Sequence, residues 1–245
     1  MDWPEELVKD LARRRCVIYL GAGISMNARD DNDIHPPSWI QFLNNGKDKV
    51  TNIDVKNDIE DCINTKQLLM ACELLKTELG SDSFNSLLRD CFVGKGYYSS
   101  EIHDDIYNLD SRIVMTPCFD KIYETNAVSK SRGTIAVKNY YDTDLADFIR
   151  NDQFIIIKNH GTIDVKDRII FTQSDYAKTR IQNSDFYKIM EALILTHSFV
   201  FFGAGVNDPD IRLLFENYSC SYNLSRTHYF TIPEGELTHK QLEIL

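Results

Sequence analysis

Residues 16–25 read CVIYLGAGIS, an apolar run followed by a glycine loop. A short continuous apolar run that ends in glycine is typical of a strand buried on both faces of a parallel sheet. After such a strand, Gly21 and Gly23 allow backbone amides to approach a pyrophosphate closely, and the hydroxyl of Ser25 can donate to a phosphate or ribose oxygen. The stretch therefore predicts an α/β fold with a nucleotide-binding loop that opens at Gly21.

A tight turn without any ligand is the alternative explanation of these glycines, because a sharp exit from a strand also favours glycine. The third glycine of the dehydrogenase fingerprint would fall at Met26. Its absence argues against an ordinary nicotinamide-dependent oxidoreductase.

Further apolar runs resemble the first one, and segments with helical periodicity separate several of them. They occupy residues 112–115, 134–137, 154–157, 169–172 and 198–202. Near the N-terminus, Asp2 and Glu5 fit a capping box, and the spacing of Leu7, Val8 and Leu11 predicts a helix before the first strand. We therefore expect a Rossmann-like, doubly wound and mostly parallel sheet.

The region between about residues 45 and 110 differs from the rest, because no run in it is typical of a strand. Residues 66–79, 83–92 and 101–109 have helical periodicity instead. We interpret this region as a helical insert within one domain that spans residues 1–245, and we expect it to form one wall of a cleft. Residues 236–245 resemble the start of another amphipathic helix, so the chain is expected to be the N-terminal part of a longer protein.

Composition narrows the classes of function. The formal net charge of −10 argues against direct binding to a nucleic-acid backbone, and no apolar stretch is long enough to span a membrane. The acidic N-terminus does not resemble a signal peptide, so we expect a soluble, cytoplasmic protein. The 6 cysteines form no Cys-x-x-Cys pair, and no histidine has neighbours at metal-binding spacing, so no metal site is expected.

Six short motifs lie along the chain after the first apolar run. They are residues 21–25 (GAGIS), 37–39 (PSW), 116–120 (TPCFD), 159–161 (NHG), 172–176 (TQSDY) and 202–210 (FGAGVNDPD). From about residue 16 to 232, the chain resembles the sirtuin-like domain of bacterial anti-phage defence NAD hydrolases, within the sirtuin superfamily. The resemblance implies that NAD is the substrate or ligand, and that Gly203 and Gly205 bind its adenosine half.

His160 is the expected catalytic residue. It follows the apolar run 154–157, and therefore lies where strand ends face the ligand crevice of an open α/β sheet. Histidine titrates near neutrality, so it can act as a base toward a ribose hydroxyl while nicotinamide leaves an oxocarbenium-like centre. A histidine whose ring is satisfied by backbone at a strand end is the alternative.

Two aspartates are expected to have structural roles beside the ligand. Asp208 precedes Pro209, a pair that favours the start of a helix over residues 211–217. Asp120 is expected to steady the turn after Met115 through hydrogen bonds from backbone to its side chain. The complete set of residues expected to bind NAD or ADP-ribose is Gly21, Ala22, Gly23, Ser25, Trp39, Asp120, Gly203, Gly205 and Asp208.

Cys118 departs from the family pattern. It occupies the position of an asparagine that, in the family, orders water or ribose hydroxyls beside the bond that breaks. A thiol is a weak donor and a poor acceptor, so it does not replace a carboxamide. Either another group has taken over, or activity is low or absent, or the chain carries an inactivating substitution. A nucleophilic Cys118 with His160 as its base is the least favoured hypothesis.

The favoured hypothesis is an NAD glycohydrolase of anti-phage defence that is activated by a partner or by assembly. The resemblance implies a homo-oligomer and a co-encoded defence partner. The alternative is a catalytically silent module that binds NAD or ADP-ribose as a sensor. Protein deacylation is disfavoured, because the paired cysteines of the zinc ribbon in deacylating sirtuins are missing.

Overall fold

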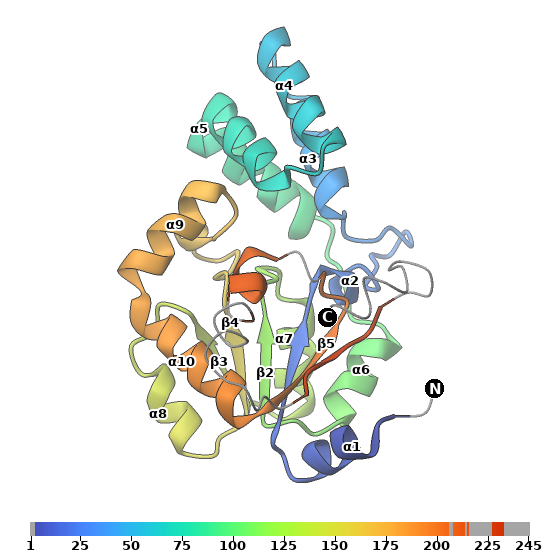
Figure 1. Ribbon diagram of the computed structural model, residues 1–245. Helices are drawn as coiled ribbons and strands as arrows, with labels where there is room; N and C mark the ends of the chain where they lie inside the picture. The colour runs from blue at the N-terminus through green and yellow to red at the C-terminus, as the bar shows by residue number, and fades with distance from the viewer. Residues whose placement is uncertain (1–2, 206–207, 214, 216–226, 233–245) are drawn as a thin grey trace.

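The computed structural model describes residues 3–205, 208–213, 215 and 227–232. Within these residues, all strands belong to one 6-stranded parallel sheet in the order β3-β4-β2-β1-β5-β6. The strands are β1 (Cys16–Leu20), β2 (Ile113–Thr116), β3 (Ala136–Asn139), β4 (Ile155–Lys158), β5 (Ser198–Phe202) and β6 (Tyr229–Phe230). The sheet with helices on both faces confirms the expected Rossmann-like α/β fold (Figure 1).

Strand β1 lies at the centre of the sheet, where the strand order reverses. It pairs with β2 on one side and with β5 on the other, so Val17 lies between Ile113 and Phe199. Every residue of β1 is buried, as its continuous apolar sequence predicts. In open α/β sheets, ligands bind at the carboxyl ends of the strands beside such a switch point. The glycine loop at Gly21 begins there.

Alternate residues of β1 contact helices on opposite faces of the sheet. Val17 and Tyr19 belong to a core with α8 (Leu145–Arg150), α9 (Gln173–Gln182) and α10 (Ser184–Thr196). Ile18 and Leu20 belong to the opposite core with α1 (Glu5–Ala12), the short α2 (Ala22–Ser25), α6 (Glu101–Asn108) and α7 (Ile122–Lys130). Both faces of the sheet are therefore covered, which explains why the strands lack polar alternation.

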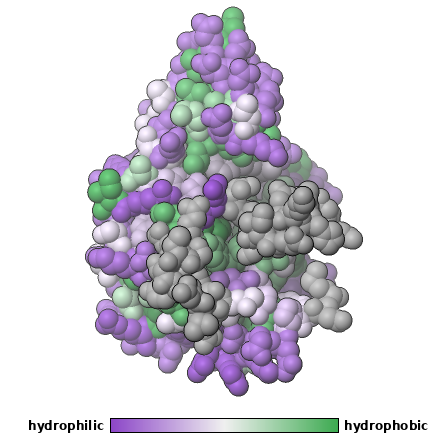
Figure 2. All heavy atoms as spheres, in the orientation of Figure 1, coloured by the Kyte–Doolittle hydropathy of each residue, from purple (hydrophilic) through white to green (hydrophobic). Residues whose placement is uncertain are grey.

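A third core lies in the helical segment beyond the carboxyl edge of the sheet (Figure 1). It contains α3 (Trp39–Lys47), α4 (Ile53–Asn64) and α5 (Leu68–Phe92). The two helices expected at 66–79 and 83–92 form one run that is kinked at Gly80, whose φ of +70° and ψ of 166° are not helical. Helix α4 was not expected from the sequence. In Figure 2, apolar side chains gather over this segment among largely hydrophilic ones.

Several sequence expectations need correction. The strand expected at residues 169–172 is wrong, because this segment is a loop that joins two cores: Ile169 packs in the helical core and Ile170 in the sheet core. Thr172 then caps α9 by accepting the Asp175 N–H at 3.1 Å. The strand expected at 134–137 begins at Ala136.

Two expectations concern the ends of the chain. Helix α1 has Pro4 as its N-cap residue, while Asp2 of the expected capping box lies outside the described residues. The amphipathic helix expected at 236–245 also lies outside them. In the part of the chain that the structure describes, no helix has the length and apolar character needed to cross a bilayer.

Candidate active site

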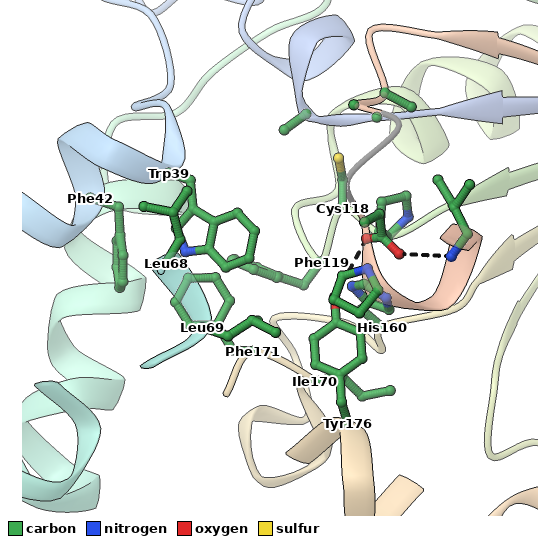
Figure 3. A pocket seen from close by; sticks show the side chains of 18 of the residues that line it. Trp39, Phe42, Leu68, Leu69, Cys118, Phe119, His160, Ile170, Phe171 and Tyr176 are labelled. Atoms are coloured by element: carbon green, nitrogen blue, oxygen red, sulfur yellow. Dashed lines mark hydrogen bonds between the residues drawn. The ribbon is translucent and has the colours of Figure 1, made fainter. Parts of the chain in front are cut away.

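A cavity of about 800 Å³ lies at the carboxyl ends of β1, β2, β4 and β5. This volume is within the range of small-molecule sites. One wall consists of the strand ends and their loops, and the helical segment forms the opposite wall, as expected. Figure 3 shows Trp39, Phe42 and Phe171 on one side, and Cys118, His160 and Tyr176 on the other. The cavity therefore combines an apolar, aromatic wall with a polar one.

The fold brings most of the expected site residues together, although they come from distant parts of the chain. Only Gly23 is not part of the cavity lining. The expected residues that line it are Gly21, Ala22, Ser25, Trp39, Cys118, Asp120, His160, Gly203, Gly205 and Asp208.

The two glycine loops pack directly against each other. The Gly21 N–H donates to the carbonyl of Phe202 at 2.9 Å, and the Gly23 N–H donates to the carbonyl of Gly203 at 2.9 Å. A Cβ at Gly21 would lie 2.3 Å from Ala204 Cα, and one at Gly23 would lie 2.9 Å from Gly203 Cα. Gly203 itself has a φ of +60°. The N–H groups of Gly21 and Gly23 therefore already have partners in the second loop, while binding of a pyrophosphate at this loop stays a prediction.

His160 lies just beyond β4, and its ring faces the cavity. Its backbone carbonyl accepts the Ile170 N–H at 3.1 Å, whereas the ring atom Nε2 is buried without a hydrogen-bond partner. The Asp210 atom Oδ2 lies 3.6 Å from that Nε2. The Tyr176 ring meets the imidazole edge-on, with 5.1 Å between centroids. The alternative in which backbone groups satisfy the His160 ring at a strand end would require a hydrogen bond to Nε2, and that atom has none.

Asp210 is a buried carboxylate at the end of the 202–210 motif, and its role was not predicted from the sequence. Arg180 of α9 donates to Oδ1 through Nε at 3.2 Å and Nη2 at 3.0 Å. The Tyr187 hydroxyl of α10 donates to Oδ2 at 3.1 Å. Burial raises the pKa of Asp210, but the nearby His160 ring and the hydrogen bonds and charge of Arg180 outweigh it, so the pKa lies below its ordinary value. The carboxylate is therefore ionised beside His160.

Asp208 starts the turn that carries Asp210. Its Oδ1 accepts the N–H groups of Asp210 at 2.9 Å and Ile211 at 3.2 Å, so the predicted capping role is confirmed. Its other oxygen accepts the Tyr176 hydroxyl at 3.4 Å (Figure 3). Burial raises the pKa of Tyr176 well above its usual value, which keeps that hydroxyl a donor. The turn is thus tied to α9 at two points, Tyr176 and Arg180.

The apolar wall is held together by the start of α3. Ser38 and Gln41 form a capping box at this helix end. The Trp39 indole N–H donates to Cys72 Sγ at 3.0 Å, and its ring lies 5.7 Å from that of Phe171. Trp39 therefore lines the cavity as part of the helical core. Within the described ranges, no group of three or more His, Cys, Asp or Glu side chains is arranged to hold a metal ion.

The comparisons with known proteins agree with this arrangement. A family model described as the SIR2-like domain matches residues 112–245, more than half of the chain. The chain belongs to the SIR2-like family. It is also 22% identical over 240 residues to NAD(+) hydrolase ThsA of Bacillus cereus (strain MSX-D12). That alignment covers 98% of this chain and 47% of the relative, so the chain spans about half the length of the curated protein that it matches.

In this SIR2-like domain, Cys118 occupies the loop after β2. Its N–H donates to the Thr116 hydroxyl at 3.1 Å, and that hydroxyl donates to the carbonyl of Leu20 at 2.8 Å, which ties the loop to β1. Burial raises the pKa of the Cys118 thiol to about 12, and the charge of Asp120 adds to this, although the Ser25 hydroxyl opposes it. The thiol is therefore protonated at neutral pH, which disfavours a nucleophilic role.

A buried ion pair between Lys158 and Glu124 also holds the loop after β2 in place. The Lys158 ammonium lies 2.6 Å from the Glu124 carboxylate of α7, and it also donates to the backbone carbonyl of Asp120. The Asp120 side chain accepts the Ile122 N–H at 3.0 Å, so its predicted role in steadying this turn is confirmed. Sequence reasoning missed Lys158 and Glu124. A lysine that ends an otherwise apolar strand was the available signal.

Proposed function

We propose that this protein is an NAD glycohydrolase. The reaction breaks the bond between nicotinamide and C1′ of the ribose and adds water there, which yields nicotinamide, ADP-ribose and a proton. The observation that carries the proposal is His160, paired with an ionised Asp210 in a cavity of about 800 Å³ at the switch point of a SIR2-like sheet. The distant relative named as an NAD(+) hydrolase supports the same chemistry.

In the proposed reaction, His160 accepts a proton from a ribose hydroxyl as positive charge develops at C1′. The oxygen of that hydroxyl gains electron density as its proton is removed, and this stabilises the oxocarbenium-like centre at C1′ while nicotinamide leaves. The aromatic wall around Trp39 and Phe171 suits a planar ring of the substrate. The motif resemblance extends the proposal to a role in anti-phage defence, with activation by a co-encoded partner or by homo-oligomerisation.

The test measures nicotinamide release from NAD by chromatography, with the purified protein alone and with co-encoded proteins added. His160→Ala is expected to lower the rate by roughly 100-fold or more, because it removes the base. His197→Ala is the matched control, since His197 follows α10 and does not line the cavity. NAD binding, measured by calorimetry, is expected to change little in either variant. Full turnover by His160→Ala would place the base elsewhere.

One observation favours a second candidate, a silent module that binds NAD or ADP-ribose. The half-buried, protonated Cys118 thiol offers neither the paired donor and acceptor of a carboxamide nor a nucleophile. Such a module would raise its melting temperature with NAD or ADP-ribose, because a ligand selective for the folded state stabilises it by mass action. This ligand-induced stabilisation without nicotinamide release, even with partners present, would favour the module over the hydrolase.

A further inference from the structure

The two nitrogens of the His160 ring have different surroundings. The Nε2 atom is buried and has no hydrogen-bond partner in the described part of the chain. The Nδ1 atom is not one of these buried, unpartnered atoms. The ring as a whole lines the cavity. In the same described part, Asp210 is the only carboxylate within 4.0 Å of the imidazole nitrogens, at 3.6 Å from Nε2. The ring therefore presents Nε2 to the protein and leaves Nδ1 for a ligand.

The partners of Asp210 determine which atom of its carboxylate faces the ring. Arg180 occupies Oδ1 with two donors, Nε and Nη2. The other oxygen, Oδ2, accepts the Tyr187 hydroxyl at 3.1 Å and points toward His160. An ionised carboxylate only accepts hydrogen bonds, so a neutral imidazole beside it is favoured when Nε2 carries the proton.

The other polar groups around the ring do not compete with this arrangement. The Tyr176 hydroxyl donates to Asp208, and the Tyr176 ring meets the imidazole only edge-on. The Tyr19 hydroxyl, which also lines the cavity, accepts the Asn159 side-chain amide at 2.9 Å. Asp208 uses its Oδ1 to cap the turn. Asp210 is thus the group that is placed to select the proton position on His160.

We propose that Asp210, held by Arg180 and Tyr187, is the positioning residue of His160: it fixes the Nε2–H tautomer and leaves the Nδ1 lone pair facing the cavity as the base. The second half of this statement rests on the proposed function. When Nδ1 accepts a proton from a ribose hydroxyl, the ring becomes an imidazolium and Asp210 stabilises its charge. The water that adds at C1′ gives a proton back to the ribose oxygen, and the proton on Nδ1 then leaves to bulk water once ADP-ribose has formed.

The tautomer is measured directly by ¹⁵N NMR of the ligand-free protein labelled at histidine, with the His160 signals assigned from a His160→Gln variant. The wild-type protein is expected to show a protonated Nε2 and an unprotonated Nδ1 in the neutral ring. A neutral His160 that carries its proton on Nδ1 would overturn the proposal. This result needs no substitution at Asp210, so it stands even if changes at that buried site impair folding.

Asp210→Asn gives a sharper test, because Arg180 determines how the amide is oriented. Its two donors at Oδ1 favour the amide oxygen there, which directs the NH₂ group toward His160. The NH₂ group then donates to Nε2, and the proton of the neutral ring moves to Nδ1. We therefore expect the variant to switch the tautomer. Asp185→Asn is the control, because Asp185 is exposed on α10 and pairs only with Lys188 among the described residues.

The effect on turnover separates positioning from simple loss of stability. Asp210→Asn is expected to lower kcat by roughly 100-fold with KM within about twofold, since the base is blocked while the cavity wall remains. Tyr187→Phe removes one donor from Oδ2 and leaves the carboxylate, so the Nε2–H tautomer is expected to persist. An Asp210→Asn variant with wild-type tautomer and wild-type kcat would overturn the proposal.

The two proposals fail in different ways. A protein that cleaves no NAD but shows the expected tautomer, with its switch in Asp210→Asn, would contradict the glycohydrolase and support the positioning role of Asp210. The opposite result is NAD cleavage that depends on His160, with the same tautomer and kcat in the Asp210→Asn variant as in the wild type. It would support the glycohydrolase and overturn the positioning role.

Discussion

Replacing Gly21 by alanine separates two explanations of the first glycine loop. If the glycine is needed for a pyrophosphate, the ligand-free protein should tolerate the extra methyl group. If it is needed for packing, the ligand-free protein should lose stability. The added Cβ would lie 2.3 Å from both Ala204 Cα and the Gly203 carbonyl oxygen, and these backbone atoms are not free to rotate away. Ordinary carbon contacts lie at about 3.5–4.0 Å, so the two loops must separate by more than about 1 Å.

The expected cost follows from this overlap. Overpacking of a buried site typically costs about 1–3 kcal/mol, and a clash with backbone belongs at the upper end of that range. For a chain of this size, each kcal/mol lowers Tm by roughly 2–4 °C, so Gly21→Ala is expected to melt about 6–12 °C below the wild type. The assay is thermal unfolding without ligand, followed by circular dichroism or calorimetry.

Gly205→Ala is the matched control from the second loop. A Cβ there meets no described atom within 4 Å, so the ligand-free Tm is expected to stay within about 2 °C of the wild type. The packing argument would be refuted by a ligand-free Gly21→Ala protein that also melts within about 2 °C of the wild type. In that case, loss of NAD-induced stabilisation in the same variant would support the pyrophosphate explanation.

Two further predictions concern other residues. Cys118→Asn is expected to raise nicotinamide release by roughly tenfold or more, because a carboxamide can position water or ribose hydroxyls beside C1′. A wild-type protein that is faster than this variant would mean that the thiol itself takes part in the reaction. Burial lowers the pKa of His228 from its ordinary value of 6.5 to about 4, and its Nδ1 accepts the Phe199 N–H at 3.1 Å. The unfolded chain therefore binds a proton more readily, so the urea midpoint should be highest above pH 6.5 and fall as the pH decreases toward 4. His228→Gln should weaken the pH dependence of the urea midpoint. An unchanged pH profile in that variant would show that His228 is not the group responsible for it.

The sequence predicted the strands well where their signal is local. The run that became β1 is apolar throughout, and that of β5 is apolar after Ser198, because helices cover both faces of the sheet. The same signal failed at residues 169–172, where Ile169 and Ile170 are buried by two different cores without strand pairing. Apolar residues report burial, and burial alone does not distinguish a strand from a loop between two cores.

The candidate site was predicted in part for a similar reason. His160 follows a strand and Asp208 precedes a proline, and these local contexts indicate where each residue lies. Arg180 and Asp210 carried no such signal, because an arginine on a helix is usually solvated and the second aspartate of the motif resembles an ordinary first-turn residue. Their importance lies in a contact between α9 and the turn at Asp208, which the sequence does not encode locally.

The sequence by itself thus determined the sheet, its glycine loops and the end of β4 at which His160 stands, since each depends on residues that are neighbours in the chain. Only the tertiary structure decided that Gly21 and Gly23 pack against Gly203 and Ala204, and that Asp210 faces His160. The physical reason is that backbone contacts between loops, and the pairing of a buried carboxylate, depend on distances between segments far apart in the sequence. Parallel strand pairing brings those segments to one edge of the sheet, and the fit of α9 and α10 against it fixes which side chains meet.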